Sequence, residues 1–319
     1  MKQAISIFIL FFASCMYAQD HVRFLIFADI HYDMMPDGAS RLETILQAAQ
    51  KNKVSFIANM GDMAAPDPQY RPLKERLNRV SLPIYHIIGN HDTDQKGKQA
   101  FMDFFGMKAS YYSVDKGKFR FIFLDSNYFI DKDGQEKDYH RTNYTSSNQI
   151  NRYSKQELQW LKSQLDTEQI CVLFSHSPIN DGYEKIIENT EIHQILVDAR
   201  SKGTLIAAVF GGHIHSDNYH VIDGLHYIQV NSASNIWGGS KFTNTERYPE
   251  EVYKQYSSLK YIIPYRDALY AVVDVYSNGK VKIKGRKSSY LPPAPDAEKL
   301  KTKSYPCSPF ILDRKFNYK

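Results

Sequence analysis

The first half of the sequence alternates short apolar runs with segments of helical character. Apolar runs at 22–28, 54–60 and 83–88 predict strands, and the segments between them at 41–51 and 66–80 predict helices. Two parallel strands need a crossover connection, which is usually a helix, so this alternation indicates parallel pairing. We therefore expect an α/β fold built on a partly parallel sheet.

The second half continues this pattern and then departs from it. A helix predicted at 191–202 separates two further apolar runs, 170–175 and 205–210. From residue 220 onward, short strands follow one another with no crossover helix between them, and we expect those strands to pair antiparallel. The sequence thus predicts sheets of mixed strand direction.

Two polar segments, 127–152 and 238–260, are longer than the usual connections of a compact domain. They either shape a binding site or are solvent-exposed insertions. Both lie inside one predicted domain, 19–287. The Pro-rich stretch at 291–295 predicts that residues 288–319 form an irregular C-terminal tail.

The N-terminus predicts export. Met1-Lys2 precedes an apolar run at 4–13, which is shorter than the about 20 residues that span a bilayer. Small residues then lead to a polar junction, as in a secretory signal peptide. We expect residues 1–18 to be removed by cleavage after Ala18, which gives a periplasmic or secreted protein.

Cys15 leaves a second localisation open. The stretch Phe-Ala-Ser-Cys that ends at Cys15 loosely resembles a bacterial lipoprotein box, in which the cysteine is lipidated. The protein would then be an outer-membrane lipoprotein, and this is the one case in which we expect contact with a membrane. The net charge of +5 is spread along the chain without a dense Lys/Arg block, so no nucleic-acid polymer is expected as a partner.

Side chains that can bind metal ions follow five of the predicted strands. In chain order they occur in Asp29-Ile-His31, Gly61-Asp62, Gly89-Asn90-His91-Asp92, Ser175-His176 and Gly211-Gly-His213-Ile-His215. In an open α/β sheet, ligands bind beyond the carboxyl ends of the strands, so these residues can converge although they are far apart in the chain. Each cluster alone is a common pattern, but their occurrence at successive strand ends predicts a metal site.

These motifs resemble the signature of the calcineurin-like metallophosphoesterase superfamily. That signature is Asp-x-His, Gly-Asp, Gly-Asn-His-Asp/Glu, a lone His and Gly-His-x-His, and the resemblance covers about residues 22–230. It implies a four-layer α/β/β/α sandwich of two mixed sheets with helices outside. It also implies a dinuclear metal centre.

The resemblance assigns a role to each site residue. Asp29, His31 and His215 would hold one metal ion, and Asn90, His176 and His213 the other. Asp62 would bridge the two ions. His91 would face the substrate phosphate, and Asp92 would orient the His91 ring.

The ligand types agree with this assignment on chemical grounds. Carboxylates and imidazoles suit Mn, Fe or Zn, and geometry rather than raw affinity selects among these ions. Two ions about 4 Å apart clamp the attacking and leaving oxygens and activate a water molecule. A protonated His91 could stabilise phosphoryl charge or donate to the leaving alkoxide. We therefore expect a phosphoric ester hydrolase that acts on small molecules.

Longer stretches resemble two branches of the superfamily. The motif pattern is similar to bacterial cyclic-nucleotide phosphodiesterases. Residues 27–32, 119–125 and 175–179 are similar to manganese-dependent ADP-ribose/CDP-alcohol diphosphatases, which usually have Gln where this chain has His31. Phosphodiester or pyrophosphate bonds of nucleotide-like molecules are therefore the expected targets. The alternatives are a phosphomonoesterase and a non-catalytic secreted metal-binding protein.

Three aromatic residues lie close in sequence to the metal motifs. They are Tyr32, Tyr183 and Trp237. A flat ring at the rim of a site can stack on a nucleobase, which makes these residues candidate substrate contacts. The alternative is that the rings pack in the core or seal loops.

Overall fold

The computed structural model describes residues 20–141, 149–180 and 190–319. The predicted signal peptide, Cys15 and Tyr183 lie outside these ranges. None of the helices in the described ranges combines the length and the apolarity needed to cross a bilayer.

The first of two six-stranded sheets contains the N-terminal strand at its centre. Its order is β17-β16-β15-β1-β2-β3. The strands are β1 (His21–Phe27), β2 (Ile57–Asn59), β3 (Ile84–His86), β15 (Ala271–Tyr276), β16 (Lys280–Lys284) and β17 (Arg314–Asn317). β1, β2 and β3 are parallel, whereas β15, β16 and β17 pair antiparallel.

The second sheet has the order β11-β12-β10-β9-β5-β4. The strands are β4 (Tyr112–Lys116), β5 (Phe119–Phe123), β9 (Ile170–Ser175), β10 (Ile206–Gly211), β11 (Asn218–Ile222) and β12 (Leu225–Gln229). The four inner strands are parallel, and the two edge strands are antiparallel to their neighbours. The antiparallel prediction for the late strands is therefore wrong for β12 on the side that faces β10.

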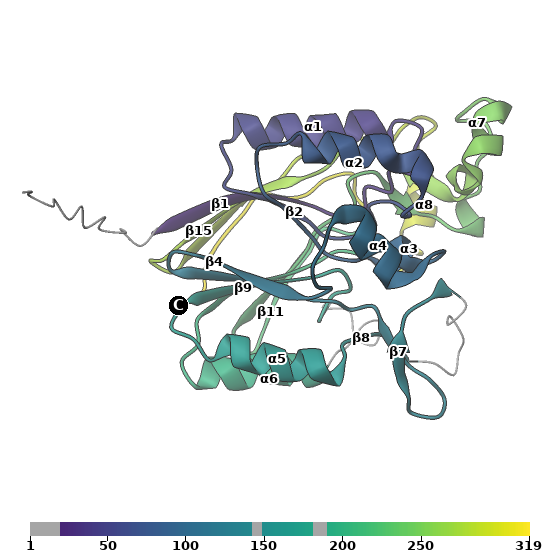
Figure 1. Ribbon diagram of the computed structural model, residues 1–319. Coiled ribbons are helices and arrows are strands. Elements are labelled where there is room, and N and C mark those ends of the chain that lie inside the picture. The colour runs from purple at the N-terminus through teal and green to yellow at the C-terminus, as the bar shows by residue number, and fades with distance from the viewer. Residues whose placement is uncertain (1–19, 142–148, 181–189) are drawn as a thin grey trace, which may run out of the picture.

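Helices cover the outer face of each sheet, as Figure 1 shows. Helices α1 (Gly38–Lys51) and α2 (Arg71–Asn78) lie over the first sheet, and α5 (Lys155–Leu165) and α6 (Thr190–Ser201) lie over the second. Phe24 from the first sheet packs against Phe174 and Phe210 from the second, with ring centroids 5.6 and 6.0 Å apart. The predicted four-layer sandwich is thus confirmed.

Burial on both faces explains why these strands read as continuous apolar runs. All six residues of β9 and of β10 are buried, because the facing sheet covers one side and helices the other. The hydrophobic clusters follow the same layers. One lies between the sheets, one beneath α1 and one beneath α5 and α6. The two sheets therefore form a rigid support for the loops at their edges.

The long polar segments contain secondary structure of their own. Within 127–152, strands β6 (Tyr128–Ile130), β7 (Glu136–Asp138) and β8 (Gln149–Arg152) form a small sheet. Helix α7 (Glu250–Gln255), flanked by two 3-10 turns, lies within 238–260, between β13 (Asn235–Trp237) and β14 (Ile262–Pro264).

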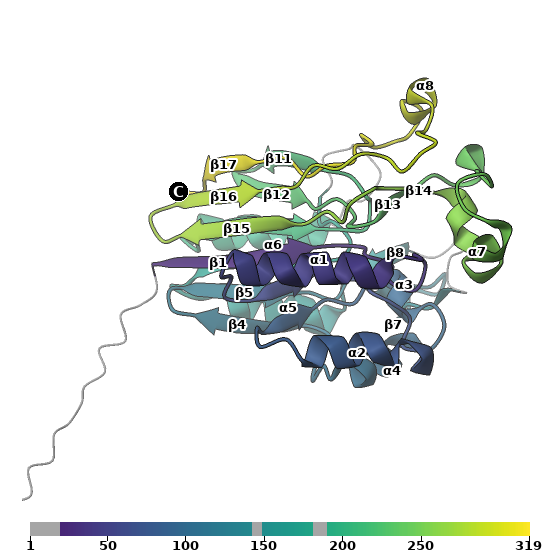
Figure 2. The same ribbon diagram turned by 90° about the horizontal axis from the view of Figure 1, so that it is seen from above.

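The prediction of an irregular C-terminal tail is wrong for two segments. Helix α8 (Ala297–Leu300) forms within it, and β17 adds an edge strand to the first sheet with Lys280 opposite Asn317. The free edge of β16 offers backbone hydrogen-bonding groups, and Phe316 packs on Tyr219 of the other sheet. Figure 2 shows this last segment returning along the sheet edge.

A buried ion pair ties the small sheet to the domain. Helix α4 (Gly97–Phe105) follows the short helix α3 (Asn90–Thr93) and carries Lys98, whose side chain is 7% exposed. The Lys98 ammonium lies 2.7 Å from Asp125 Oδ2, 2.6 Å from Asp138 Oδ1 and 3.4 Å from the centre of the Tyr128 ring. Asp125 is fully buried, so its charge depends on Lys98 for compensation.

We expect Lys98→Met to lower the free energy of unfolding by about 3–5 kcal/mol, because it leaves a buried carboxylate without its partner. The midpoint of urea denaturation measures this change. Lys96→Met is the matched control, since Lys96 pairs with Asp67 while 41% exposed. Such surface pairs contribute about 0–1 kcal/mol. Equal midpoints for the two variants would contradict the assigned role of Lys98.

Candidate metal centre

The five motif loops meet at one edge of the sandwich, beyond the carboxyl ends of β1, β2, β3, β9 and β10. Backbone hydrogen bonds join neighbouring loops. The Asp29 N–H donates to the Gly61 carbonyl at 3.1 Å, and the His31 N–H donates to the Asp62 carbonyl at 3.0 Å. On the second sheet, the Gly212 N–H donates to the His176 carbonyl at 2.8 Å. The loops are therefore held together by their backbones as well as by their side chains.

Several site residues have an unusual backbone conformation. Five of the seven non-glycine residues with positive φ in the described ranges belong to the candidate site: Asp29, His31, Asp62, His213 and His215, with φ between 47° and 69°. A residue with a Cβ adopts this left-handed region only where its surroundings enforce it. The motif glycines serve the same close packing, because a Cβ at Gly89 would collide with the Asp62 carboxylate.

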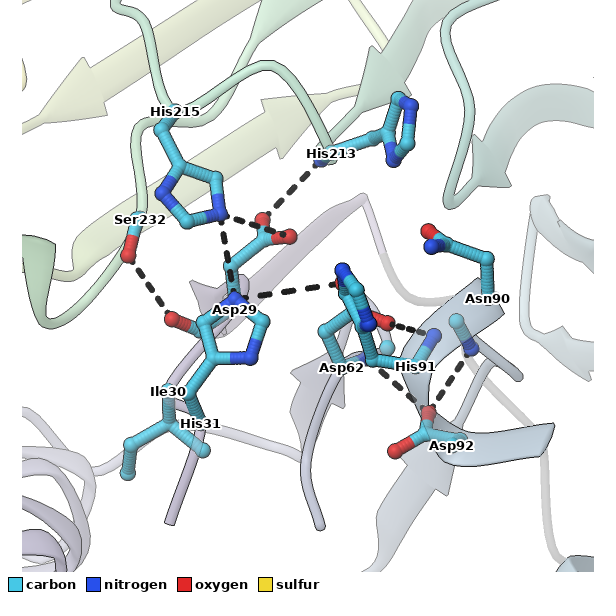
Figure 3. Close-up of polar contacts among 12 residues, drawn as sticks. Asp29, Ile30, His31, Asp62, Asn90, His91, Asp92, His213, His215 and Ser232 are labelled. Atoms are coloured by element: carbon cyan, nitrogen blue, oxygen red, sulfur yellow. Dashed lines mark hydrogen bonds and ion pairs between the residues drawn. The ribbon is translucent and has the colours of Figure 1, made fainter. Parts of the chain in front are cut away.

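The first group of predicted ligands converges as expected. Ligand atoms of Asp29, His31 and His215 all lie within 4.8 Å of one another. His31 Nε2 is 3.2 Å from His215 Nε2, which is 3.5 Å from Asp29 Oδ1. Figure 3 shows these three side chains pointing toward one another.

The second group lies beside the first. Asp62, His176 and His213 also place ligand atoms within 4.8 Å of one another. Asn90 Oδ1 is 3.1 Å from His176 Nε2. Asp62 Oδ2 is 3.4 Å from His176 Nε2 and 3.9 Å from Nε2 of His31, which belongs to the first group. The Asp62 carboxylate thus stands between the two groups, as a bridging ligand would.

Backbone carbonyls orient two of the imidazole rings. His176 Nδ1 is 2.8 Å from the Met60 carbonyl oxygen, and His215 Nδ1 is 2.8 Å from the Asn235 carbonyl oxygen. A carbonyl can only accept, so each Nδ1 carries a hydrogen, and Nε2 is the nitrogen of each ring that is directed into the centre.

The donor set fits a pair of cations. Asp29 Oδ1 is buried without a hydrogen-bond partner among the described residues. Nε2 of His215 lies 3.5 Å from Asp29 Oδ1, and Nε2 of His176 lies 3.4 Å from Asp62 Oδ2, so without a proton or a metal ion on Nε2 the lone pairs of each pair face one another. Such an arrangement is costly in a buried site unless a positive charge lies between the atoms.

Burial also prepares two ligand rings for metal binding. It lowers the pKa of His31 to about 3 and that of His213 to about 4, so both rings are neutral at pH 7. For His176, burial opposes the charged ring, but the Asp62 carboxylate outweighs burial and raises the pKa to about 10. A proton on His176 Nε2 offsets the same repulsion that a metal ion would offset.

The predicted role of Asp92 is wrong. Its carboxylate does not touch the His91 ring but accepts the backbone N–H groups of Gly89, Asp62, Met63 and Ala64 at 2.8–3.1 Å. It therefore fastens the loop after β2 to the loop after β3. The partner of the His91 ring is Asp94, whose Oδ2 lies 2.7 Å from Nδ1.

Asp94 was not a predicted site residue. Its other carboxylate oxygen accepts from the Tyr139 hydroxyl at 3.2 Å. Partial burial disfavours the charged His91 ring, but Asp62 and Asp94 outweigh that effect and raise the pKa of His91 to about 9. With Nδ1 engaged, Nε2 is the ring nitrogen of His91 that can reach a substrate.

A cleft of about 390 Å³ opens over the centre. Its lining includes His31, Asp62, Asn90, His91, His213 and His215 from the motifs, together with Trp237 at the rim. The C-terminal segment adds Lys303, Tyr305 and Cys307, which sequence reasoning missed because no motif marks them.

The three aromatic residues predicted to contact the substrate have different positions. Trp237 lines the cleft and is 46% exposed, which is unusual for so large an apolar side chain. Tyr32 packs instead with Tyr70, at 6.2 Å between ring centroids, against the cluster beneath α1, and it is not part of the described cleft lining. Tyr183 lies outside the described residues.

Known proteins resemble this chain in sequence. The family profile described as "Calcineurin-like phosphoesterase" matches residues 22–217. A probable glycerophosphodiester phosphodiesterase, GpdQ, from Arcobacter nitrofigilis is 24% identical over 175 residues, which is 52% of this chain and 58% of that protein. The chain thus matches little more than half the length of this relative.

Two solved structures share the fold. A dimetal phosphatase from Danio rerio has a TM-score of 0.55 at 15% identity, covering 85% of this chain and 98% of that one. GAP50 of Plasmodium, described as the anchor in the inner membrane complex, has a TM-score of 0.54 at 14% identity, covering 94% and 90%. At these identities the likeness shows the fold alone.

We expect Asp62→Asn to reduce the metal content from about two ions per chain to below one, because one carboxylate serves both groups. Elemental analysis after reconstitution and removal of free metal measures the content. Asp94→Asn is the control, since it removes a carboxylate near the centre that contacts His91 rather than a ligand. A content of two ions in Asp62→Asn would exclude the bridging position.

Proposed function

Since the chain belongs to the calcineurin-like phosphoesterase family, we propose that it is an exported dinuclear-metal enzyme that hydrolyses phosphodiester or pyrophosphate bonds of nucleotide-like molecules. The observation that carries the dinuclear part is the position of Asp62 Oδ2, 3.4 Å from His176 and 3.9 Å from His31. This places one carboxylate between two buried groups of ligands.

The ligand groups have separate tasks in this proposal. Asp29, His31 and His215 would hold one ion, Asn90, His176 and His213 would hold the other, and Asp62 would bind both. When bound, two such ions activate the attacking water and offset the charge of the phosphoryl oxygens. Mn, Fe and Zn all suit this donor set.

His91 is the proposed catalytic side chain. Its ring lines the cleft, and the Asp94 carboxylate holds it through Nδ1 at 2.7 Å. Nε2 is then directed to the phosphate, where it donates a hydrogen bond to a phosphoryl oxygen or a proton to the leaving oxygen. Asp92 acts on the loops and not on the ring.

The rim of the cleft supports a diester or pyrophosphate with an aromatic group. An exposed indole at Trp237 offers a flat surface on which a nucleobase stacks. The curated relative is named as a phosphodiesterase, which supports the same choice. Phosphomonoester hydrolysis is the alternative, because a dinuclear centre serves both reactions.

Export is proposed from the charged start and short apolar run of residues 1–18. A mature chain that begins near Gln19 is periplasmic or secreted, and a lipid on Cys15 would make it an outer-membrane lipoprotein. N-terminal sequencing and mass measurement of the mature protein distinguish these forms from a chain that retains Met1.

We expect His91→Ala to keep both metal ions and to lower kcat by about 10²–10⁴-fold, the usual contribution of an acid–base group. Asp94→Asn keeps an acceptor for His91 Nδ1 but removes the negative charge, so we expect it to lower kcat by less than His91→Ala does. His176→Ala is the contrasting variant, because it should lose metal from one group. The role of His91 is wrong if His91→Ala loses metal while turnover per bound pair of ions stays the same.

Steady-state kinetics on three substrates test the proposed reaction. We expect kcat/KM for bis(p-nitrophenyl) phosphate or ADP-ribose to exceed that for p-nitrophenyl phosphate by more than about tenfold, or 1.4 kcal/mol. A tenfold preference for the monoester would establish the alternative activity. No turnover of any of the three by metal-loaded protein would instead favour a non-catalytic metal-binding protein.

A further inference from the structure

The C-terminal segment places a lysine at the rim of the metal cleft. Lys303, Tyr305 and Cys307 line the cleft together with Trp237 and the motif residues. The Lys303 Nζ donates to the Trp237 backbone carbonyl at 2.7 Å. The ammonium is therefore held against the backbone of Trp237, and both side chains line the same cleft.

The segment that carries Lys303 is fixed at several points. On its N-terminal side, the Asp296 side chain caps α8, and the Lys303 N–H donates to the Leu300 carbonyl at 3.1 Å. On its C-terminal side, the Ser216 hydroxyl donates to the Pro306 carbonyl at 2.8 Å, and Asn231 Nδ2 donates to the Ser308 carbonyl at 2.7 Å. Ser216 follows the last metal motif directly, so the segment is tied to the metal loop itself.

Among the residues that the structure describes, no carboxylate pairs with the charge of Lys303. Within the described part of the chain, no Asp or Glu oxygen lies within 4 Å of its Nζ. Lys301, two residues earlier, shows the ordinary arrangement, with its ammonium 2.6 Å from Glu298 on a 70% exposed side chain. Lys303 is instead partly buried and folded back toward the cleft.

An ammonium has three N–H donors, and the Trp237 carbonyl takes one. The remaining donors are available to an anion that enters the cleft. The scissile phosphate belongs over the metal ligands at the base, so the anion at Lys303 would be a different group of the same substrate. A second phosphoryl group is the chemical class that matches a cation in a cleft that also exposes an indole ring.

We infer that Lys303 and Trp237 form a distal subsite that binds a second phosphoryl group and the base of a nucleotide-like substrate. This inference rests on the proposed function, because it assumes that the scissile phosphate lies over the motif residues. Beyond the proposed function, the inference makes the enzyme selective for esters that carry two phosphoryl groups. Lys303 is a specificity-determining residue in this arrangement, and His91 and the ligands act on the other phosphate.

Calorimetric binding of product-like nucleotides to the metal-loaded protein tests this subsite without turnover. One pair, ADP and AMP, differs by a phosphoryl group joined through an anhydride. A second pair, thymidine 3′,5′-bisphosphate and thymidine 5′-phosphate, differs by a phosphoryl group joined through the sugar. In the wild type the doubly phosphorylated member of at least one pair should bind more tightly, and the pair that responds identifies the linkage.

Lys303→Gln should reduce that preference by about tenfold, which is 1.4 kcal/mol. Lys303→Arg should retain it, because the charge and the donors remain. Lys301→Gln is the matched control and should keep the wild-type ratio, since Lys301 pairs with Glu298 and does not line the cleft. The inference is overturned if Lys303→Gln leaves both ratios within twofold of the wild type. It is also overturned if the variant weakens both members of each pair equally, because Lys303 would then only support the fold.

Kinetics separate this inference from the proposed reaction. Thymidine 5′-(p-nitrophenyl phosphate), with and without a 3′-phosphate, presents the same scissile bond in both forms. Turnover of these diesters tests the proposed function, whereas the ratio of their kcat/KM values in Lys303→Gln and wild type tests the subsite. The subsite alone is rejected if the diesters are turned over but Lys303→Gln changes neither the ratio of kcat/KM values nor the ratio of affinities measured by calorimetry. Binding preference without turnover rejects the proposed reaction alone.

Discussion

The buried carboxylate of Asp92 holds together the two loops on which the centre depends. It accepts four backbone N–H groups from the loops after β2 and β3 while being fully buried. A buried carboxylate is tolerated only where its oxygens are hydrogen-bonded, so the loops are confined to the arrangement that supplies those donors. This confinement positions Asp62, whose Oδ1 accepts the His91 N–H at 2.9 Å and whose Oδ2 lies between His31 and His176.

Rigid sheets allow the centre to hold strained residues. Each non-glycine residue in the left-handed region costs on the order of 1–3 kcal/mol, and five of them occur in the candidate site. Such conformations persist because β1, β9 and β10 are packed between helices and the facing sheet, so the strand ends that carry the loops cannot relax. The strain is thus a property of the loops, and the layered core offsets it. The sequence does not predict these left-handed conformations, because Asp and His also occur in turns with ordinary backbone angles.

The strands and the metal-binding side chains at their ends could be predicted because both follow from regular features, whereas the four layers and the role of each ligand were predicted from the family resemblance. Apolar runs of strand length mark buried strands, and the polar residues after them share one sheet edge. The error at Asp92 has a geometric cause. Residues three apart share a face of a helix, so the ring of His91 in α3 meets Asp94, the residue that ends this helix, whereas adjacent Asp92 points toward the loop backbone. Strand β17 was not predicted, because Phe316 is its only apolar residue. Its pairing also depends on β16, which lies far away in the sequence.

The cleft has a base formed by the motif residues and a rim formed by other residues. This division explains why the family is recognised from one part of the chain and the substrate is selected by another. The base is made by the loops at the strand ends, whose positions the two sheets fix, and in the proposed reaction it contacts only the phosphoryl group and the attacking oxygen. It therefore responds weakly to whatever else the ester carries. The rim is made by Trp237 and by the segment that contains Lys303, neither of which belongs to a motif. Discrimination between substrates is a difference in binding free energy, so it must arise where substrates differ. A change in the rim can then alter the substrate while the dinuclear centre and its reaction stay the same.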